Sequence, residues 1–119
     1  MDKYTIVFYE DSRGRCLVDE LLDELPPKVR AKIEKWLEKL EIEGPNLPRP
    51  YADMVAGKIR ELRVIFSNQY RFLYFFHGKL IVVTHGFIKK TARVPIEEIE
   101  RANRMMQDFI ERYKGGENR

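Results

Sequence analysis

The 119-residue chain contains very little cysteine, because Cys16 stands alone. A single thiol can form neither an intrachain disulfide nor a cysteine metal cluster, so both ways of stabilising a small domain are excluded. A lone thiol is typical of the reducing cytoplasm, where we expect this protein to be located.

Long apolar runs are also missing. No run approaches the roughly 20 residues that a transmembrane helix requires. Asp2 and Lys3 stand where a signal peptide would have a basic segment and then an apolar one. We therefore expect no membrane association. The length predicts one domain over residues 1–119, large enough to bury a modest core.

Acidic residues are scarce in one region. Residues 57–93 contain one acid, Glu61, against eight Lys or Arg, whereas acids are frequent in residues 1–43. The net charge of +3 is too small to prove nucleic-acid binding. The uneven distribution nevertheless favours a local anion-binding surface over charge that serves only solubility.

Three runs rich in β-branched and aromatic residues are present, at 58–66, 69–76 and 79–88. Very short breaks separate them, which predicts an antiparallel meander. Basic residues punctuate these strands. Because a sheet must bury at least one face, we expect the charged face to be exposed to an anionic ligand.

The flanking segments complete a predicted α+β domain. A strand is expected at 4–10, with Ile6 and Phe8 on one face. Helical spacing predicts two helices, from 17 to 25 and from 27 to 43, and a last helix from 95 to about 113, followed by a frayed tail at 115–119. Residues 45–57 indicate a loop with one helical turn at 51–55. The order predicts an N-terminal strand and helical hairpin, then the three-strand meander and a C-terminal helix, with all helices on one face of the sheet.

The lengths of the two hairpin loops decide which strand residues share a face. With two odd loops the apolar face carries Leu62, Val64, Phe66, Phe72, Tyr74, Phe76 and Val82. The other face then carries Glu61, Arg63, Arg71, His85 and Lys89, with Arg71 opposite His85. We expect this register because it keeps charge out of the core. An even loop, such as a two-residue turn at His77-Gly78, would mix the faces.

Several motifs together resemble a known family. These are ELR at 61–63, YRFLYFF at 70–76 and HGFIKK at 85–90, followed by Thr91 and Pro95. The chain resembles, over nearly its whole length, the HigB-like, phage-derived branch of the RelE/ParE toxin superfamily. The most specific part is the set Phe87, Lys89, Lys90, Thr91 and Pro95.

The resemblance implies a RelE-like fold and the toxin of a type II toxin–antitoxin pair. Many such toxins are endoribonucleases that cut mRNA on the translating ribosome, and so inhibit translation without a cofactor or metal. The implied partner is a helix-turn-helix antitoxin, and operator DNA would be bound only through the complex of the two proteins.

Metal-free RNA cleavage needs a general base, cations that stabilise the phosphorane, and a general acid. The catalytic candidates are Arg63, Arg71, His85 and Lys89, which combine guanidinium forks with groups that can transfer protons. The candidates for RNA binding are Lys58, Arg60, Tyr70 and Lys90.

Other interpretations stay open at this point. Arg63 could be a structural partner of Glu61, and His85 could be a packed strand residue. Because Glu61 is the sole acid of the region, the general base is unassigned. Two other functions are compatible with the chain: a non-nuclease toxin that inhibits a protein such as DNA gyrase, and a catalytically silent RNA- or ribosome-binding module.

Overall fold

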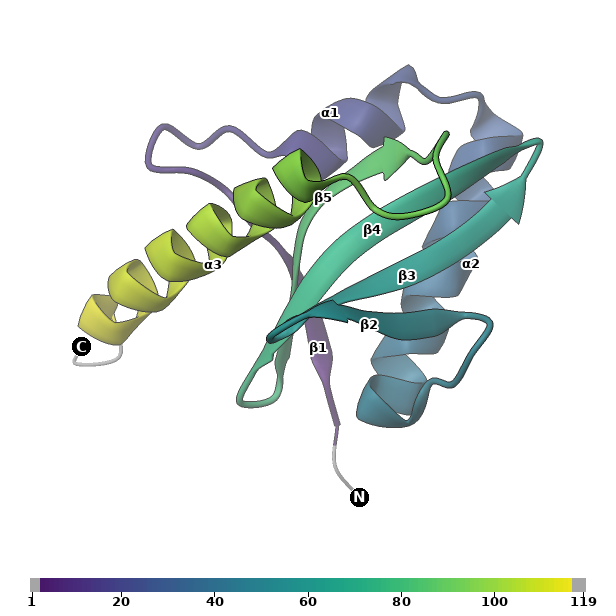
Figure 1. The fold of residues 1–119 in the computed structure, drawn as a ribbon. Helices are drawn as coiled ribbons and strands as arrows, with labels where there is room; N and C mark the ends of the chain where they lie inside the picture. The colour runs from purple at the N-terminus through teal and green to yellow at the C-terminus, as the bar shows by residue number, and fades with distance from the viewer. Residues whose placement is uncertain (1–2, 117–119) are drawn as a thin grey trace.

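The computed structural model describes residues 3–116, with side chains as far as residue 113. It is an α+β fold, as predicted, with three helices and a five-stranded mixed sheet (Figure 1). The strands are β1 (Thr5–Phe8), β2 (Ala52–Ala56), β3 (Ile59–Phe66), β4 (Asn68–His77) and β5 (Leu80–Ile88). The helices are α1 (Leu17–Glu24), α2 (Pro27–Glu43) and α3 (Ile96–Gly116), with a short 3₁₀ turn at Gly44–Asn46.

Local sequence signals explain the helical hairpin. Pro27 occupies the first turn of α2, where its missing N–H costs no intrahelical bond. Gly44 ends the helix with a φ of 56° and donates its N–H to the Leu40 carbonyl. A Cβ at Gly44 would lie 2.8 Å from the Tyr4 ring, so close packing as well as backbone conformation favours glycine.

The sheet order is β1-β5-β4-β3-β2. β1 pairs in parallel with β5, and the other three pairings are antiparallel. The predicted meander is confirmed as β3, β4 and β5. The helical turn predicted at 51–55 is wrong: these residues lie largely in β2, an edge strand that pairs with β3. Hydrogen bonds to β3 therefore decide the conformation of this short segment.

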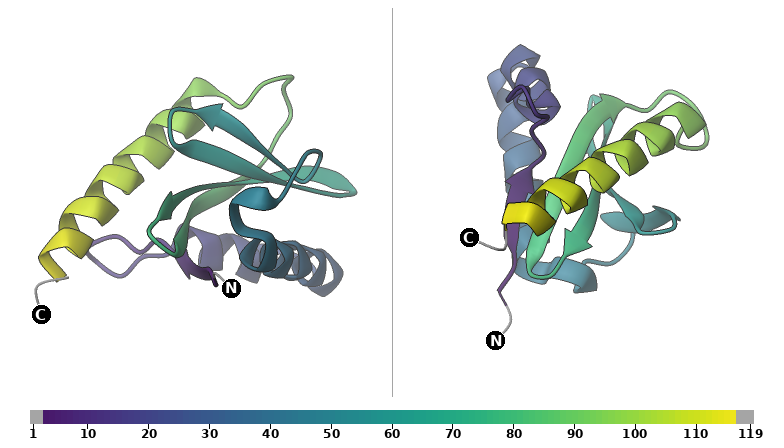
Figure 2. Two further views of the ribbon diagram at one scale, coloured as in Figure 1. Left: turned by 90° about the horizontal axis from the view of Figure 1, so that it is seen from below. Right: turned by 90° about the vertical axis from the view of Figure 1, so that its left-hand side faces the viewer.

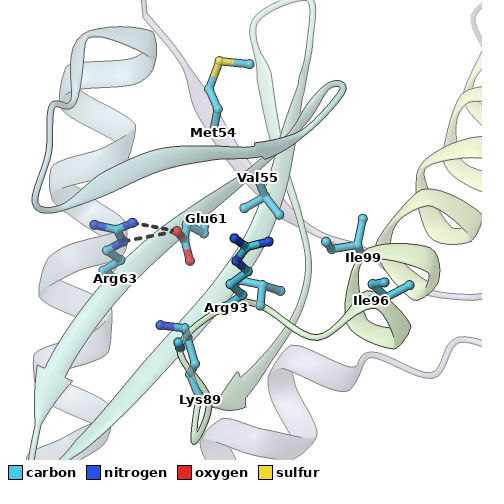
Figure 3. A pocket seen from close by; sticks show the side chains of 10 residues that line it. Met54, Val55, Glu61, Arg63, Lys89, Arg93, Ile96 and Ile99 are labelled. Atoms are coloured by element: carbon cyan, nitrogen blue, oxygen red, sulfur yellow. Dashed lines mark hydrogen bonds and ion pairs between the residues drawn. The ribbon is translucent and has the colours of Figure 1, made fainter.

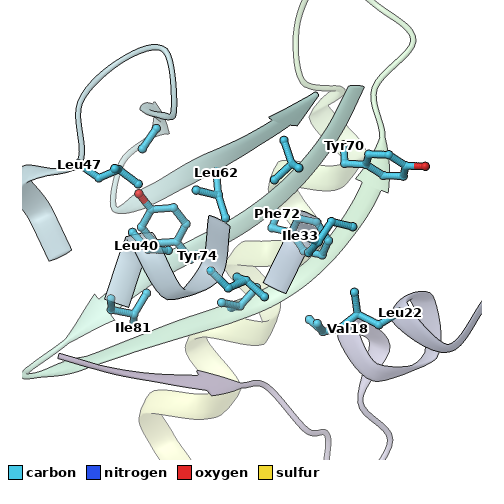
Figure 4. Close-up of a cluster of buried hydrophobic side chains, with 14 of the residues drawn as sticks. Val18, Leu22, Ile33, Leu40, Leu47, Leu62, Tyr70, Phe72, Tyr74 and Ile81 are labelled. Carbon is cyan, nitrogen blue, oxygen red and sulfur yellow. The ribbon is translucent and has the colours of Figure 1, made fainter. Parts of the chain in front are cut away.

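Helices cover both faces of the sheet, so the prediction that they share one face is wrong. α1 and α2 pack on one side, here called the first face, and α3 crosses the opposite side, the second face (Figure 2). The core of the first face is apolar (Figure 4). It includes Ile33 and Leu40 of α2 packed with Leu62, Phe72 and Tyr74 of the sheet.

The hairpin loops explain which side chains share a face. Ser67 alone connects β3 to β4, an odd loop that places Arg63 and Arg71 on one face, as predicted, and sets them directly opposite each other. The β4–β5 loop has two residues, Gly78 and Lys79, so Val82 lies on the second face with Phe75 and not with Leu62. The prediction for Val82 is therefore wrong.

The two-residue loop shifts by one which β5 residues point to each face, and a β-bulge further along β5 reverses that shift. The register shifts between Leu73 and Tyr74, which leaves Thr84 as the extra residue on β5. His85 consequently returns to the second face, where it pairs with Leu73, while Phe87 lies opposite Arg71. The predicted pairing of Arg71 with His85 is wrong, although both lie on the same face.

The C-terminal helix is longer than predicted. α3 continues to Gly116, beyond the expected end near Tyr113 and into the tail expected to fray. The rest of that tail, 117–119, lies outside the described residues. Ala102 and Met106 pack on Leu73 and Phe75, so burial of an apolar stripe holds α3 on the sheet.

Candidate functional site

Two arginines face each other across β3 and β4. Directly opposed like charges destabilise a sheet, so the pair needs a counter-ion. Glu61 provides it, because Arg63 donates Nε and Nη2 to Glu61 Oε2 at 3.2 and 3.0 Å. Arg71 Nε lies 3.0 Å from Glu61 Oε1, an ion pair without hydrogen-bond geometry. The three side chains form a compact cluster, here called the Arg–Glu–Arg cluster.

Burial distinguishes the two arginines of this cluster. The side chain of Arg71 is 5% exposed and that of Glu61 7%, whereas that of Arg63 is 28% exposed. Arg71 also donates to the Tyr70 carbonyl and to Gln69 Oε1. Burial lowers the pKa of Arg71, Glu61 opposes that effect, and the charge of Arg63 adds to it. Arg63 is thus the arginine that a ligand can reach.

Asp53 of β2 is a partner that the sequence analysis missed. Its Oδ2 accepts a hydrogen bond from Arg63 Nη2 at 3.2 Å and lies 3.1 Å from Arg49 Nε. The backbone N–H of Met54 and the two arginines lower the pKa of Asp53. The alternation of Ala52, Asp53 and Met54 was a possible signal of a strand that would place Asp53 beside Glu61.

A cleft of about 400 Å³ opens beside the Arg–Glu–Arg cluster (Figure 3). One end is charged and the other is aliphatic. The lining residues are Met54, Val55, Glu61, Arg63, Lys89, Ala92, Arg93, Val94, Ile96 and Ile99. Lys89 follows β5 and is anchored by its backbone N–H, which donates to the Gln69 carbonyl at 2.7 Å. Neither Lys89 nor Arg93 has an ion-pair partner within the described part of the chain, so both cations are available to an anion.

His85 lies away from this cleft. Its side chain is 2% exposed beneath α3, and its two ring nitrogens contact Glu98 Oε1 at 2.9 Å and Thr84 Oγ1 at 3.0 Å. Burial lowers the pKa of His85, while Glu98 opposes that effect. His85 is therefore neutral at pH 7 and connects β5 to the first turn of α3. Glu98 was not identified from the sequence, because 13 residues separate the partners.

The four residues predicted to bind RNA do not gather at the cleft. Lys58 is exposed in the turn between β2 and β3. Arg60 lies on the first face, with its guanidinium 5.8 Å from the centre of the Phe76 ring. Tyr70 is 2% exposed in the core of the first face, which leaves little of its ring for a base. Lys90 is exposed just beyond Lys89.

The structure thus brings three predicted residues, Arg63, Arg71 and Lys89, to one end of the second face. Arg93 joins them, although the sequence analysis did not select it; the basic run from Lys89 to Arg93 was the available signal. Between residues 3 and 113, no group of three His, Cys, Asp or Glu side chains is placed to hold a metal ion. None of the described helices is both long and apolar enough to cross a bilayer.

The chain was compared with known protein families. Residues 20–107 match the model of a family described as phage-derived protein Gp49-like (DUF891). This family is associated with the toxins of toxin–antitoxin systems and is related to the RelE/HigB type, and it implies an antitoxin partner. No curated protein matches the chain. The match covers α2, the whole meander and the cleft.

Proposed function

The chain belongs to the family of phage-derived Gp49-like proteins, and we propose that it is a HigB-like type II toxin that cleaves mRNA. The observation that carries the proposal is the cleft on the second face. There, the partly exposed Arg63 lines the same cleft as Lys89 and Arg93, two cations without an ion-pair partner in the described structure. A phosphate is the ligand that suits such a set of donors.

In the proposed reaction the ribose 2′-oxygen attacks the adjacent phosphorus. A bond forms between phosphorus and the 2′-oxygen, and the bond to the 5′-oxygen breaks. The products are a 2′,3′-cyclic phosphate and a 5′-hydroxyl. Arg63, Lys89 and Arg93 stabilise the additional negative charge of the phosphorane.

Two protons must move in this reaction, one from the 2′-hydroxyl and one to the 5′-oxygen. Among the described lining residues, Glu61 and Lys89 carry the groups that can exchange protons, since arginine does not. Lys89 is the better placed as acid for the 5′-oxygen, because Glu61 is already held by Arg63 and Arg71. The proton of the 2′-hydroxyl passes to solvent water in the open cleft. His85 would have to leave Glu98 to reach RNA, so we assign it the role of holding α3.

The proposed macromolecular partners are mRNA on the ribosome and a helix-turn-helix antitoxin, with operator DNA contacted through the toxin–antitoxin complex. Electrostatic attraction of RNA to Lys89, Lys90 and Arg93 supports the first. Glu61 and Asp53 partly cancel the charge of the two strand arginines, so Lys89 and Arg93 dominate the field at the cleft, and Lys90 adds to it from just outside.

A second candidate is a module that binds RNA or the ribosome without cutting. One observation favours it: both strand arginines are already paired with carboxylates, and His85 is engaged at both ring nitrogens. On this alternative the Arg–Glu–Arg cluster only stabilises the sheet, and Lys89 and Arg93 bind phosphate.

Induced expression in a bacterial host, with primer extension on abundant mRNAs, separates these candidates. Wild type is compared with Lys89→Ala and Arg93→Ala. Lys35→Ala is the matched control, because Lys35 belongs to α2, on the opposite side of the sheet from the cleft. We expect growth arrest with new mRNA 5′ ends for wild type and Lys35→Ala, and at least a tenfold loss of cleavage for the two cleft variants. Growth arrest with intact mRNA would exclude nuclease activity. It would leave two candidates: a module that binds RNA or the ribosome without cutting, and a toxin that inhibits a protein target.

A further inference from the structure

The end of the cleft opposite the charged residues has no role in the chemistry above. Its wall consists of the aliphatic side chains Val55, Val94, Ile96 and Ile99. Val55 lies on the β2 side and the two isoleucines on the α3 side (Figure 3). Ile96 is 69% exposed, among the most exposed large apolar residues of the described chain. Beside the other three aliphatic side chains it belongs to an apolar patch, the kind of surface that marks a binding site.

Three of these residues are held firmly in place. Val55 and Val94 pack against the core beneath α3 and are half-buried, as is Ile99. Ile96 is the first residue of α3 and projects from a helix that the core anchors. The wall is therefore a preformed apolar surface beside the cations, and not a mobile chain end.

We propose that this aliphatic wall is a base-binding subsite, which receives the nucleobase attached to the ribose-phosphate held by Arg63, Lys89 and Arg93. A nucleotide has a charged phosphate and a flat, weakly polar base. The cleft has a cationic half that would bind the phosphate and, next to it, an aliphatic half that would bind the base. A volume of about 400 Å³ suits one nucleotide better than a protein segment. The inference rests on the proposed function, because it places RNA in this cleft.

The chemistry of the wall also predicts its selectivity. Aliphatic side chains offer dispersion and burial but no hydrogen bonds, so they cannot read the Watson–Crick edge of a base. They favour the larger apolar face of a purine over that of a pyrimidine, by an amount that depends on the area covered. We expect a purine preference of about threefold, and little discrimination between adenine and guanine by these side chains.

Binding of a short RNA that cannot be cut tests the subsite directly. The probes are 2′-O-methyl triadenylate and the same backbone without its three bases, titrated into the intact protein. We expect the intact oligomer to bind about tenfold more tightly than the abasic one, and the methyl NMR signals of Ile96 and Ile99 to shift with the intact oligomer alone. Equal affinity for the two probes would overturn the base-binding subsite while leaving the cleft as a phosphate site.

Variants at Ile96 sharpen the test. Ile96→Ser should lower the affinity for triadenylate about threefold and leave the abasic probe unchanged. Ile42→Ser is the matched control, since Ile42 is 72% exposed on α2 and far from the cleft. Ile96→Trp should raise the affinity, because an aromatic ring stacks on a base better than an alkyl chain. A gain of this kind cannot result from unfolding.

The remaining outcomes are distinguishable. If wild type binds neither probe and cuts no mRNA, the proposed function fails together with the inference. If wild type cuts mRNA and Ile96→Ser binds both probes like wild type, the function stands and the subsite is wrong. If Ile96→Ser keeps its RNA affinity but weakens the complex with a coexpressed antitoxin, the wall is a protein contact, which also overturns the inference.

Discussion

The two faces of the sheet are built differently. Between the sheet and α1 and α2, the first face buries an almost wholly apolar core that includes Phe72 and Tyr74 (Figure 4). Among the described helices, α3 is the one that covers the second face, and this face contains the buried charged or titratable side chains Glu61, Arg71 and His85. α3 leaves one end of this face open, and the cleft lies there. Complete packing therefore stabilises one face, and incomplete packing leaves a site on the other.

The largest loss of stability is expected from a truncation in the first face. Phe72 is fully buried, so Phe72→Ala should lower the free energy of unfolding by about 3–5 kcal/mol through lost burial and the cavity left behind. Urea denaturation followed by circular dichroism measures the change. Ile42→Ser on the surface is the control and should change it by less than about 0.5 kcal/mol. A loss below about 1 kcal/mol for Phe72→Ala would contradict the tightly packed first face.

Removal of one charge from the second face should cost slightly less. Glu61→Gln keeps the shape but leaves the buried Arg71 without its counter-charge, so we expect a loss of roughly 3 kcal/mol. The double variant Glu61→Gln/Arg71→Met should lose less than the sum of the two single variants, because the two charges interact. Denaturant titration of wild type, the two single variants and the double variant gives the double-mutant cycle. Additive losses would show that the Arg–Glu–Arg cluster is not coupled.

A smaller loss of stability is expected at Gly86 of β5, which pairs with Phe72 of β4. A Cβ at Gly86 would lie 2.4 Å from Cε2 of Phe72, so Gly86→Ala should destabilise the fold by about 1–3 kcal/mol through overpacking. Phe72→Leu removes the atoms of the clash, and Gly86→Ala should cost less in that background. Thermal unfolding of both pairs compares the two costs. An equal cost in the two backgrounds would place the strain elsewhere.

The smallest effect concerns pH and His85 on the second face. Because burial holds the pKa of folded His85 below its ordinary value of 6.5, the unfolded chain takes up a proton first as pH falls. The stability contributed by neutral His85 is therefore present above pH 6.5 and is lost below it, until the lower folded pKa is reached. The slope is at most about 1.4 kcal/mol per pH unit for one proton.

Stability curves of wild type and His85→Gln between pH 7.5 and 5 test this sign. The variant should show a shallower fall, because glutamine does not titrate. Ile42→Ser is the control, since it changes an exposed residue of α2 and keeps His85, and the slope of its curve should match that of wild type. Stability of wild type that rises as pH falls would mean that the pairing with Glu98 outweighs burial.

Local patterns were sufficient for most elements. The proline and glycine boundaries predicted α1 and α2, and the β-branched runs predicted β3, β4 and β5 to within about two residues. β2 was missed because a five-residue edge strand that closely follows Pro48 and Pro50 offers only a brief alternation, and the prolines favoured a loop there. The odd register between β3 and β4 was anticipated, and with it the placement of Arg63 and Arg71 on one face, but not their direct opposition.

The candidate site was less predictable for a definite reason. The face to which a given β5 residue points is reversed twice, once by the two-residue loop Gly78-Lys79 and once by the bulge at Thr84. No local sequence pattern predicts both the loop length and the bulge. The two changes cancel for His85 but not for Val82. The partners Asp53 and Glu98 reach Arg63 and His85 from other elements, so their contacts depend on the packing of β2 and α3.

The amino-acid order alone therefore specifies the type and sequence of nearly all elements, together with the excess of basic residues on the meander, because turn chemistry and periodicity act over a few neighbouring residues. Three features depend on contacts distant in the chain: the side of the sheet that α3 covers, the neutralisation of Arg71 by Glu61, and the burial of His85. The cleft with its charged and aliphatic halves belongs with them, since it is bounded by β2, β3, α3 and the segment after β5, and exists only when all four are packed together.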